Sequence, residues 1–166
     1  MIRLLENRDI QTICQIVNDN WKSVYKGYVN EELLNNKGCL ERKNRLNKDF
    51  KSGRLTNYIY EQNGQPIALL SVGKTTDEDK SEAYELWRIY IQQSYQGKGI
   101  GSQLIEKAEL EALRNGYKEM IIWAFKENTP AIKFYKKHGY QQEMEQYLGK
   151  PYEAYGVRLV KKLRMV

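Results

Sequence analysis

The spacing of apolar residues in the first part of the chain predicts a short strand followed by two helical segments. Residues 1–5 fit a strand, and Asp9 stands where it can cap a helix. The apolar face of that helix has helical spacing and consists of Ile10, Ile13, Cys14, Val17 and Trp21. A second helical stretch covers residues 30–52, interrupted near Gly38, and offers Leu33, Leu34, Leu40, Leu46 and Phe50 for a core.

The pattern then changes to strands. Residues 55–62 fit a strand that turns at Asn63-Gly64, a dipeptide typical of hairpins, and the partner strand runs from Ile67 to Val72. Polar residues 75–81 form the next turn. A strand rich in aromatic and branched residues follows from Ala83 to Ile91.

The last part of the chain predicts one strand between two helices and a closing pair of strands. The expected elements are a helix from Ile100 to Arg114 ended by Asn115-Gly116, a strand Glu119 to Phe125, a helix from Pro130 to Lys137, and strands near 140–147 and 154–163. An early helical block, a meander and a strand–helix–strand unit together predict an α/β fold. We expect a mixed, mostly antiparallel sheet with one parallel pair.

Composition limits the classes of protein that fit. A chain of 166 residues suits one domain, residues 1–166. The net charge of +6 comes from scattered side chains without a basic run or known module, so a nucleic-acid partner is not expected. Cys14 and Cys39 lack a disulfide framework, and we expect reduced thiols in a cytoplasmic protein. No segment has the roughly 20 apolar residues of a membrane span, and we do not expect the early-charged start to act as a signal peptide.

The segment with the most chemical information is Gln96 to Ser102, which contains Gly97, Gly99 and Gly101 between a strand and a helix. Glycines allow close approach of a ligand, and the helix that follows adds its dipole and unpaired N–H groups, a combination suited to phosphate. The dinucleotide pattern fails here, because its last glycine position falls on Ser102 or Leu104. The P-loop pattern fails because Gly99 stands where Ser or Thr is required.

A third phosphate-binding pattern, Gln/Arg-x-x-Gly-x-Gly/Ala, fits in full through Gln96, Gly99 and Gly101. Strand, pattern and helix resemble the coenzyme A pyrophosphate loop of the GNAT (Gcn5-related N-acetyltransferase) family. A second segment, through Asn128, Ala131, Phe134, Tyr135, Gly139 and Tyr140, resembles that family's Asn-x-x-Ala-x-x-Phe-Tyr-x-x-x-Gly-Phe/Tyr motif. One helix and one strand separate the two segments, as in the family, so the resemblance covers nearly the whole chain.

The resemblance implies acetyl-CoA as the acyl donor and a cleft where two strands splay apart. Backbone groups of Ile89, Tyr90 and Ile91 would pair with the pantetheine amides. The pyrophosphate would be held by the loop residues Gly97, Lys98, Gly99, Ile100, Gly101 and Ser102. Gln96 and Ala131 are further positions of the two motifs. Asn128 would either contact pantetheine or cap its helix.

The same resemblance suggests a general acid and a general base. Tyr135 corresponds to the family's usual leaving-group acid, and Glu85 lies where several members carry a catalytic glutamate. Strand alternation places Glu85 on one face with Trp87, Ile89 and Ile91. A carboxylate among apolar neighbours has a raised pKa, which suits a base near neutrality. Many relatives use only an ordered water instead, and the sequence leaves this alternative open.

The acceptor is expected to be a primary amine of a small molecule or peptide. By position in the family, Trp21, Tyr25, Tyr28 and Tyr152 are candidates for its site. Polyamines, aminoglycosides, amino acids and protein N-termini all remain open, and an acidic patch for a polycation could come from Glu31, Glu32, Glu143, Glu145 and Glu153.

No metal site is expected, and His138 receives no catalytic role. Family members often form homodimers, and a second hypothesis is an acyl-CoA-binding module without turnover.

Overall fold

A seven-stranded sheet runs through the middle of the molecule, which is described here for residues 1–165 of a computed structural model. Its order is β1-β2-β3-β4-β5-β7-β6, and every neighbouring pair is antiparallel except β4 and β5. The bounds are β1 Ile2–Leu4, β2 Thr56–Gln62, β3 Gln65–Lys74, β4 Tyr84–Ile91, β5 Glu119–Phe125, β6 Gln141–Tyr147 and β7 Tyr155–Lys162. The expected α/β fold with one parallel pair is confirmed.

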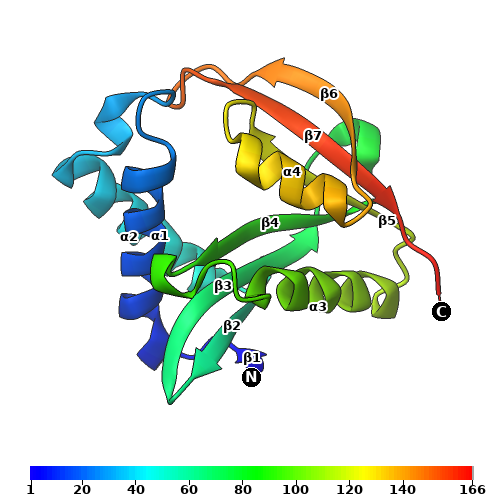
Figure 1. The fold of residues 1–166 in the computed structure, drawn as a ribbon, viewed down its shortest axis with the longest axis horizontal. Coiled ribbons are helices and arrows are strands. Elements are labelled where there is room, and N and C mark those ends of the chain that lie inside the picture. The colour runs from blue at the N-terminus through cyan, green and yellow to red at the C-terminus, as the bar shows by residue number, and fades with distance from the viewer. Residues whose placement is uncertain (166) are drawn as a thin grey trace.

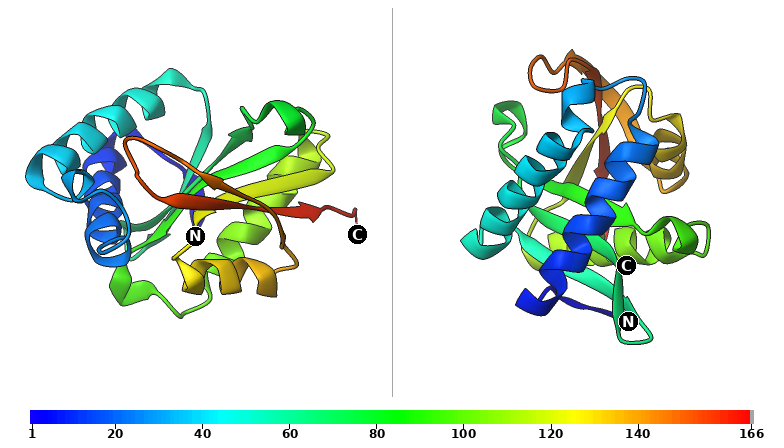
Figure 2. Two further views of the ribbon diagram at one scale, coloured as in Figure 1. Left: turned by 90° about the horizontal axis from the view of Figure 1, so that it is seen from above. Right: turned by 90° about the vertical axis from the view of Figure 1, so that its left-hand side faces the viewer.

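Four helices cover the two faces of the sheet (Figures 1 and 2). The helices α1 (Ile10–Val24) and α2 (Asn36–Ser52) bury their apolar residues against one face. The other face carries α3 (Ile100–Arg114) and α4 (Thr129–Lys137), which belong to the larger apolar cluster. Short 3-10 turns occupy Asn7–Asp9, Glu31–Leu33, Glu78–Lys80 and Gln93–Tyr95. Among these helices, none combines the length and apolar character needed to cross a membrane.

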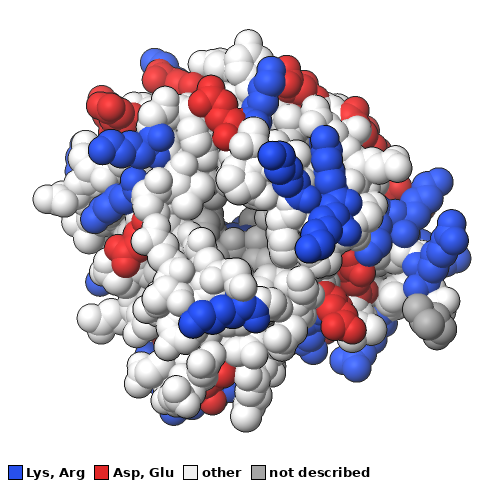
Figure 3. Space-filling model, in the orientation of Figure 1, with Lys and Arg blue, Asp and Glu red and all other residues white. Residues whose placement is uncertain are grey.

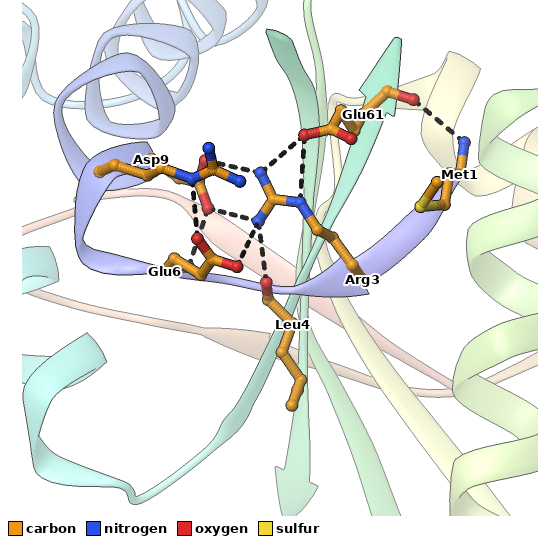
Figure 4. A network of polar contacts seen from close by, with 7 residues as sticks. Met1, Arg3, Leu4, Glu6, Asp9 and Glu61 are labelled. Atoms are coloured by element: carbon orange, nitrogen blue, oxygen red, sulfur yellow. Dashed lines mark hydrogen bonds and ion pairs between the residues drawn. The ribbon is translucent and has the colours of Figure 1, made fainter. Parts of the chain in front are cut away.

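Asp9 does not cap α1 in the way the sequence suggested. Its carboxylate accepts hydrogen bonds from the backbone N–H of Glu6 at 2.8 Å and from the guanidinium of Arg3 at 2.8 and 3.0 Å. Arg3 also reaches Glu61 on β2, as Figure 4 shows. Asp9 is therefore directed toward the first strand, where its two oxygens form a pair of charge-assisted hydrogen bonds with one guanidinium.

The second helical segment also differs from the prediction. The break lies before Asn36, and Gly38 is inside α2, where an added Cβ would collide with the carbonyl of Glu32. The buried side of α2 follows a four-residue repeat through Gly38, Arg42 and Leu46. Leu40, expected in the core, lies off this repeat and is 58% exposed. The inner position between Gly38 and Leu46 is thus occupied by an arginine.

Strands β4 and β5 pair over only three positions before they separate. Tyr84, Glu85 and Leu86 lie opposite Met120, Ile121 and Ile122. From Trp87 onward β4 pairs only with β3, and from Trp123 onward β5 pairs only with β7. The backbone of β4 near its end therefore faces an open side of the sheet.

A bulge in β4 changes which side chains share a face. Ser71 of β3 lies opposite Arg88 and Val72 lies opposite Leu86, so Trp87 is the extra residue. Beyond it, Ile89 packs with Leu86 on the α3 side, whereas Tyr90 packs on the α1 side. The predicted grouping of Glu85 with Ile89 and Ile91 is wrong, since simple alternation does not survive an extra residue.

Candidate active site

The glycine-rich loop leaves the start of α3 open to a ligand. Gly97 and Gly99 have φ of 75° and 82°, in the left-handed region that favours glycine. Gly99 is the N-cap residue, and within residues 1–165 no side chain accepts from the first N–H groups of the helix. The backbone N–H groups at Ile100, Gly101 and Ser102 have no partner within an α-helix, so they and the helix dipole are available to an anion.

Gly101 has a different reason to be glycine. An added Cβ would lie 2.9 Å from Cζ of Phe134 and 3.5 Å from Cδ1 of Ile91. The missing side chain therefore allows α3 and α4 to approach each other beside the end of β4.

Gln96 fastens the loop to the strand that precedes it. Its side-chain amide donates to the carbonyl of Ile91 at 3.0 Å and to Oδ1 of Asn20 at 3.4 Å. Asn20 donates to the same Ile91 carbonyl at 3.1 Å, which joins α1 to this point. Lys98 is exposed, with Nζ 5.4 Å from the Tyr95 ring centre. The carbonyl of Ile91 is thus already occupied, while Ile89 and Tyr90 lie on the stretch of β4 that β5 leaves unpaired.

The short helix α4 closes the other side of the opening. Oδ1 of Asn128 accepts from the backbone N–H of Ala131 at 3.4 Å, so Asn128 is a helix cap in this structure. Ala131 is half-buried and packs against the large apolar cluster. His138 connects α4 to the first turn of α3, since Nδ1 lies 2.9 Å from the carbonyl of Phe134 and Nε2 lies 3.0 Å from Oγ of Ser102.

Positive charge gathers beside this opening, which the sequence pattern did not single out. Figure 3 shows the molecule hollowed at the centre of the face seen in Figure 1, with Lys and Arg side chains over the region of α4. Lys133, Lys136 and Lys137 of α4 are exposed. Positive side chains on the exposed side of α4 thus lie over the same face of the molecule as the hollow.

Tyr135 lies among other tyrosines at the buried end of α4. The residue is 6% exposed, and burial raises the pKa of its hydroxyl, with a smaller contribution from Tyr90. Burial also raises the pKa of Tyr25 well above its ordinary value, with further contributions from Tyr90, Tyr135 and Tyr28. Nε1 of Trp21 donates to Oη of Tyr90 at 3.1 Å. Phenol groups from the residue after α1, from β4 and from α4 therefore lie close enough to influence one another's ionisation.

The four predicted acceptor residues come together around Phe125, the last residue of β5. The ring centre of Phe125 lies 5.9 Å from Trp21, 4.9 Å from Tyr25, 5.9 Å from Tyr28 and 5.8 Å from Tyr152. Such distances are those of aromatic pairs. The sequence reasoning did not include Phe125. Its position at the end of the predicted parallel strand was the available signal.

Glu85 is a buried carboxyl in the paired part of β4. The residue is 4% exposed, and Oε2 has no hydrogen-bond partner within residues 1–165. Burial raises its pKa from 4.5 to about 7, whereas a hydrogen bond from Thr75 has a smaller, opposite effect. The burial of Glu85 therefore agrees with the raised pKa that was expected. No hydrogen bond among the described residues connects this carboxyl to the Tyr135 hydroxyl.

A cavity of about 400 Å³ lies beside the aromatic cluster, between α1, α2 and β4. Trp21, Tyr90 and Tyr152 contribute to its wall, and so do Arg42 and Arg88. Within residues 1–165 no three His, Cys, Asp or Glu side chains gather in a way that could hold a metal ion. The chemistry available at this site is therefore that of a carboxyl, several phenols, guanidinium groups and free backbone N–H groups.

Comparisons with known proteins agree with this geometry. YuaI of Bacillus subtilis, an uncharacterized N-acetyltransferase, is 26% identical over 160 residues, which cover 95% of this chain and 87% of YuaI. The spermidine N(1)-acetyltransferase of Thermoplasma acidophilum is 24% identical over 86% of this chain and 88% of its own length. The structure of the PaiA N-acetyltransferase of Thermoplasma acidophilum, solved with coenzyme A, has a TM-score of 0.76, 21% identity and 98% coverage of both chains. The sequence model of the acetyltransferase (GNAT) family matches residues 11–140. This chain belongs to the GNAT family of acetyltransferases, as its two motifs indicated.

Proposed function

We propose that this enzyme transfers an acetyl group from acetyl-CoA to a primary amine of a small molecule or peptide, with Tyr135 as the general acid. The observation that carries the proposal is the separation of β4 from β5 directly beside the uncapped, glycine-bounded start of α3. Free strand backbone next to an anion-binding helix end suits a ligand that has amides at one end and phosphates at the other.

The residues at this place fit coenzyme A. The N–H groups from Gly97 to Ser102 would hold the pyrophosphate, and the exposed lysines of α4 add positive charge nearby. Backbone groups of Ile89 and Tyr90, on the stretch of β4 that β5 leaves unpaired, would bind the pantetheine arm. When bound, acetyl-CoA supplies a thioester whose carbonyl carbon an amine can attack.

The protein's task is to move two protons while one bond replaces another. The amine nitrogen bonds to the acyl carbon and loses a proton, and the carbon–sulfur bond breaks, so that sulfur takes up a proton. Glu85 accepts the first proton, directly or through water, because its pKa of about 7 keeps a basic form available near neutrality. Tyr135 gives the second, because its raised pKa keeps the phenol protonated until negative charge grows on sulfur.

A titration with coenzyme A tests the site independently of the acceptor. Gly99→Val forces a branched residue to the left-handed region and places a side chain at the phosphate position, so the thermal stabilisation by coenzyme A should disappear. Gly53→Val is the matched control, because Gly53 ends α2 with φ of 73° and, like Gly99, has no atom within 4 Å of an added Cβ.

Both variants carry similar backbone strain, and only one is near the loop. If Gly99→Val binds coenzyme A as tightly as Gly53→Val does, the loop assignment is wrong. Thiol release in the presence of an amine panel then separates an acetyltransferase from a module that binds acyl-CoA without turnover.

A further inference from the structure

The cavity between α1, α2 and β4 has an excess of positive charge. Its lining includes four arginines and a single acidic residue, Asp49, which leaves three positive charges in excess; the arginines are Arg42, Arg45, Arg54 and Arg88. A volume of about 400 Å³ is that of a small-molecule site.

Asp49 is already shared between two of these arginines. Its Oδ1 accepts from Nε of Arg54 at 2.9 Å, and its Oδ2 accepts from Nη1 of Arg88 at 2.7 Å. One carboxylate thus accepts from two guanidinium groups, and within residues 1–165 none of its hydrogen bonds or ion pairs reaches Arg42 or Arg45, which lie on the same helix α2.

Arg42 is buried without a carboxylate. The residue is 5% exposed, its Nη1 donates to Oδ1 of Asn18 at 2.8 Å, and its Nη2 donates to the carbonyl of Leu33. Nε has no partner within residues 1–165. The guanidinium carbon lies 4.0 Å from the ring centre of Trp21.

A buried guanidinium without a counter-ion is costly to keep charged. Burial lowers the pKa of Arg42, and the neighbouring charge of Arg45 acts in the same direction. An anion in the cavity would offset this cost and could accept from the free Nε–H, since guanidinium and oxyanion groups match in geometry.

The same cavity repels a polycation. The five glutamates that could have formed an acidic patch lie outside its lining. Glu143 is paired with Arg158 and Lys80, and Glu145 is paired with Lys126. The charge near Trp21 and Tyr152 therefore comes from arginine.

We propose that the acceptor is a small amine that also bears an oxyanion, as a free amino acid does, and that Arg42 and Arg45 bind its oxyanion. Trp21, Tyr90 and Tyr152 provide the apolar wall of the same cavity. This assignment names the acceptor class for the acetyl transfer proposed above and rests on that function.

Binding of matched ligand pairs tests the assignment without turnover. Thermal melts of the wild type, with and without coenzyme A, are recorded with each L-amino acid against its amide, and with 2-aminoethylphosphonate against ethanolamine, up to about 10 mM. We expect at least one member that bears an oxyanion to raise the melting temperature, and its partner that lacks the oxyanion to fail. The responding pair distinguishes a carboxylate from a phosphonate.

Three variants connect the effect to the arginines. Arg42→Gln should weaken binding of the responding anion roughly 10- to 100-fold, the range for loss of charged hydrogen bonds. Arg45→Gln, at an exposed position, should weaken it several-fold without disturbing the fold. Lys48→Gln removes a charge from an exposed position of the same helix outside the cavity lining and should leave binding unchanged.

The outcomes separate this inference from the proposed function. If coenzyme A stabilises the protein but no pair differs, or if spermidine gives the larger shift, the anionic acceptor is overturned and the acetyl-CoA function stands. If coenzyme A gives no stabilisation, the proposed function fails, and the anion pairs are still scored on the ligand-free protein. Unchanged affinity in Arg45→Gln, with Arg42→Gln either unchanged or unfolded, also overturns the assignment.

Discussion

The buried carboxyl of Glu85 should make both stability and activity depend on pH in opposite senses. Its pKa rises from 4.5 to about 7 in the folded protein because the side chain is removed from water. At about 1.4 kcal/mol per pH unit, this difference corresponds to about 3 kcal/mol. The residue is 4% exposed, so solvent screens little of this energy.

The direction follows from proton binding. Between pH 4.5 and about 7 the folded state holds a proton at Glu85 that the unfolded state has lost. The free energy of unfolding therefore falls as the pH rises through this window, and the loss is complete above it. Glu85→Gln keeps the shape and removes the ionisation, so this contribution should disappear from the variant.

Thermal melts of wild type and Glu85→Gln at pH 5 and pH 8 measure the effect. Other carboxyls cancel in the comparison of the two proteins. The variant should gain about 2.5 kcal/mol relative to wild type between the two pH values, or roughly 5 to 10 °C for a chain of this size. Glu82→Gln, at an exposed position close to the same strand, is the control and should show no such gain.

Activity gives the second half of the test. If Glu85 is the base, kcat/KM of the wild type rises with pH through about 7, and Glu85→Gln loses roughly 100-fold or more together with that rise. An equal difference in melting temperature at both pH values would refute the burial argument. If the melts behave as expected but the pH profile of the variant is unchanged, an ordered water or the acceptor itself explains the profile.

Three further predictions test the acid, the helix contact and the aromatic cluster. Tyr135→Phe should lower turnover roughly 10- to 1,000-fold and keep acetyl-CoA affinity within about twofold, as for an interaction made only in the transition state. Tyr140→Phe is its control: it loses a hydrogen bond to Glu109, so it should cost about 1 kcal/mol of stability in chemical denaturation and leave turnover intact. Gly101→Ala should destabilise by about 1 to 3 kcal/mol in the same assay, because its Cβ would meet Phe134, and an unchanged midpoint would contradict the close contact. Phe125→Leu should lower the melting temperature by an amount equivalent to about 1 to 2 kcal/mol through lost ring pairs, with calorimetry as the measurement; full stability would mean that the rings only happen to be near one another.

The sequence by itself determined the elements around the glycine-rich loop. The bounds expected for α3 and β5 agree with the structure, and the two motifs lie on the strand, loop and helix where they were predicted. These features are local, because apolar spacing, glycine and a capping asparagine act within a few residues. The raised pKa of Glu85 was also foreseen, although from a wrong assignment of its face.

The tertiary structure decided which side chains meet. A single extra residue at Trp87 reversed the faces of β4, and the packing of α2 placed Arg42 rather than Leu40 on the buried side. Phe125 became the centre of the aromatic cluster only when α1, β5 and the loop before β7 came together. Periodicity indicates that a residue is on one side of an element. Whether that side loses water, and which distant charge or ring it then meets, depends on the packing of segments far apart in the chain.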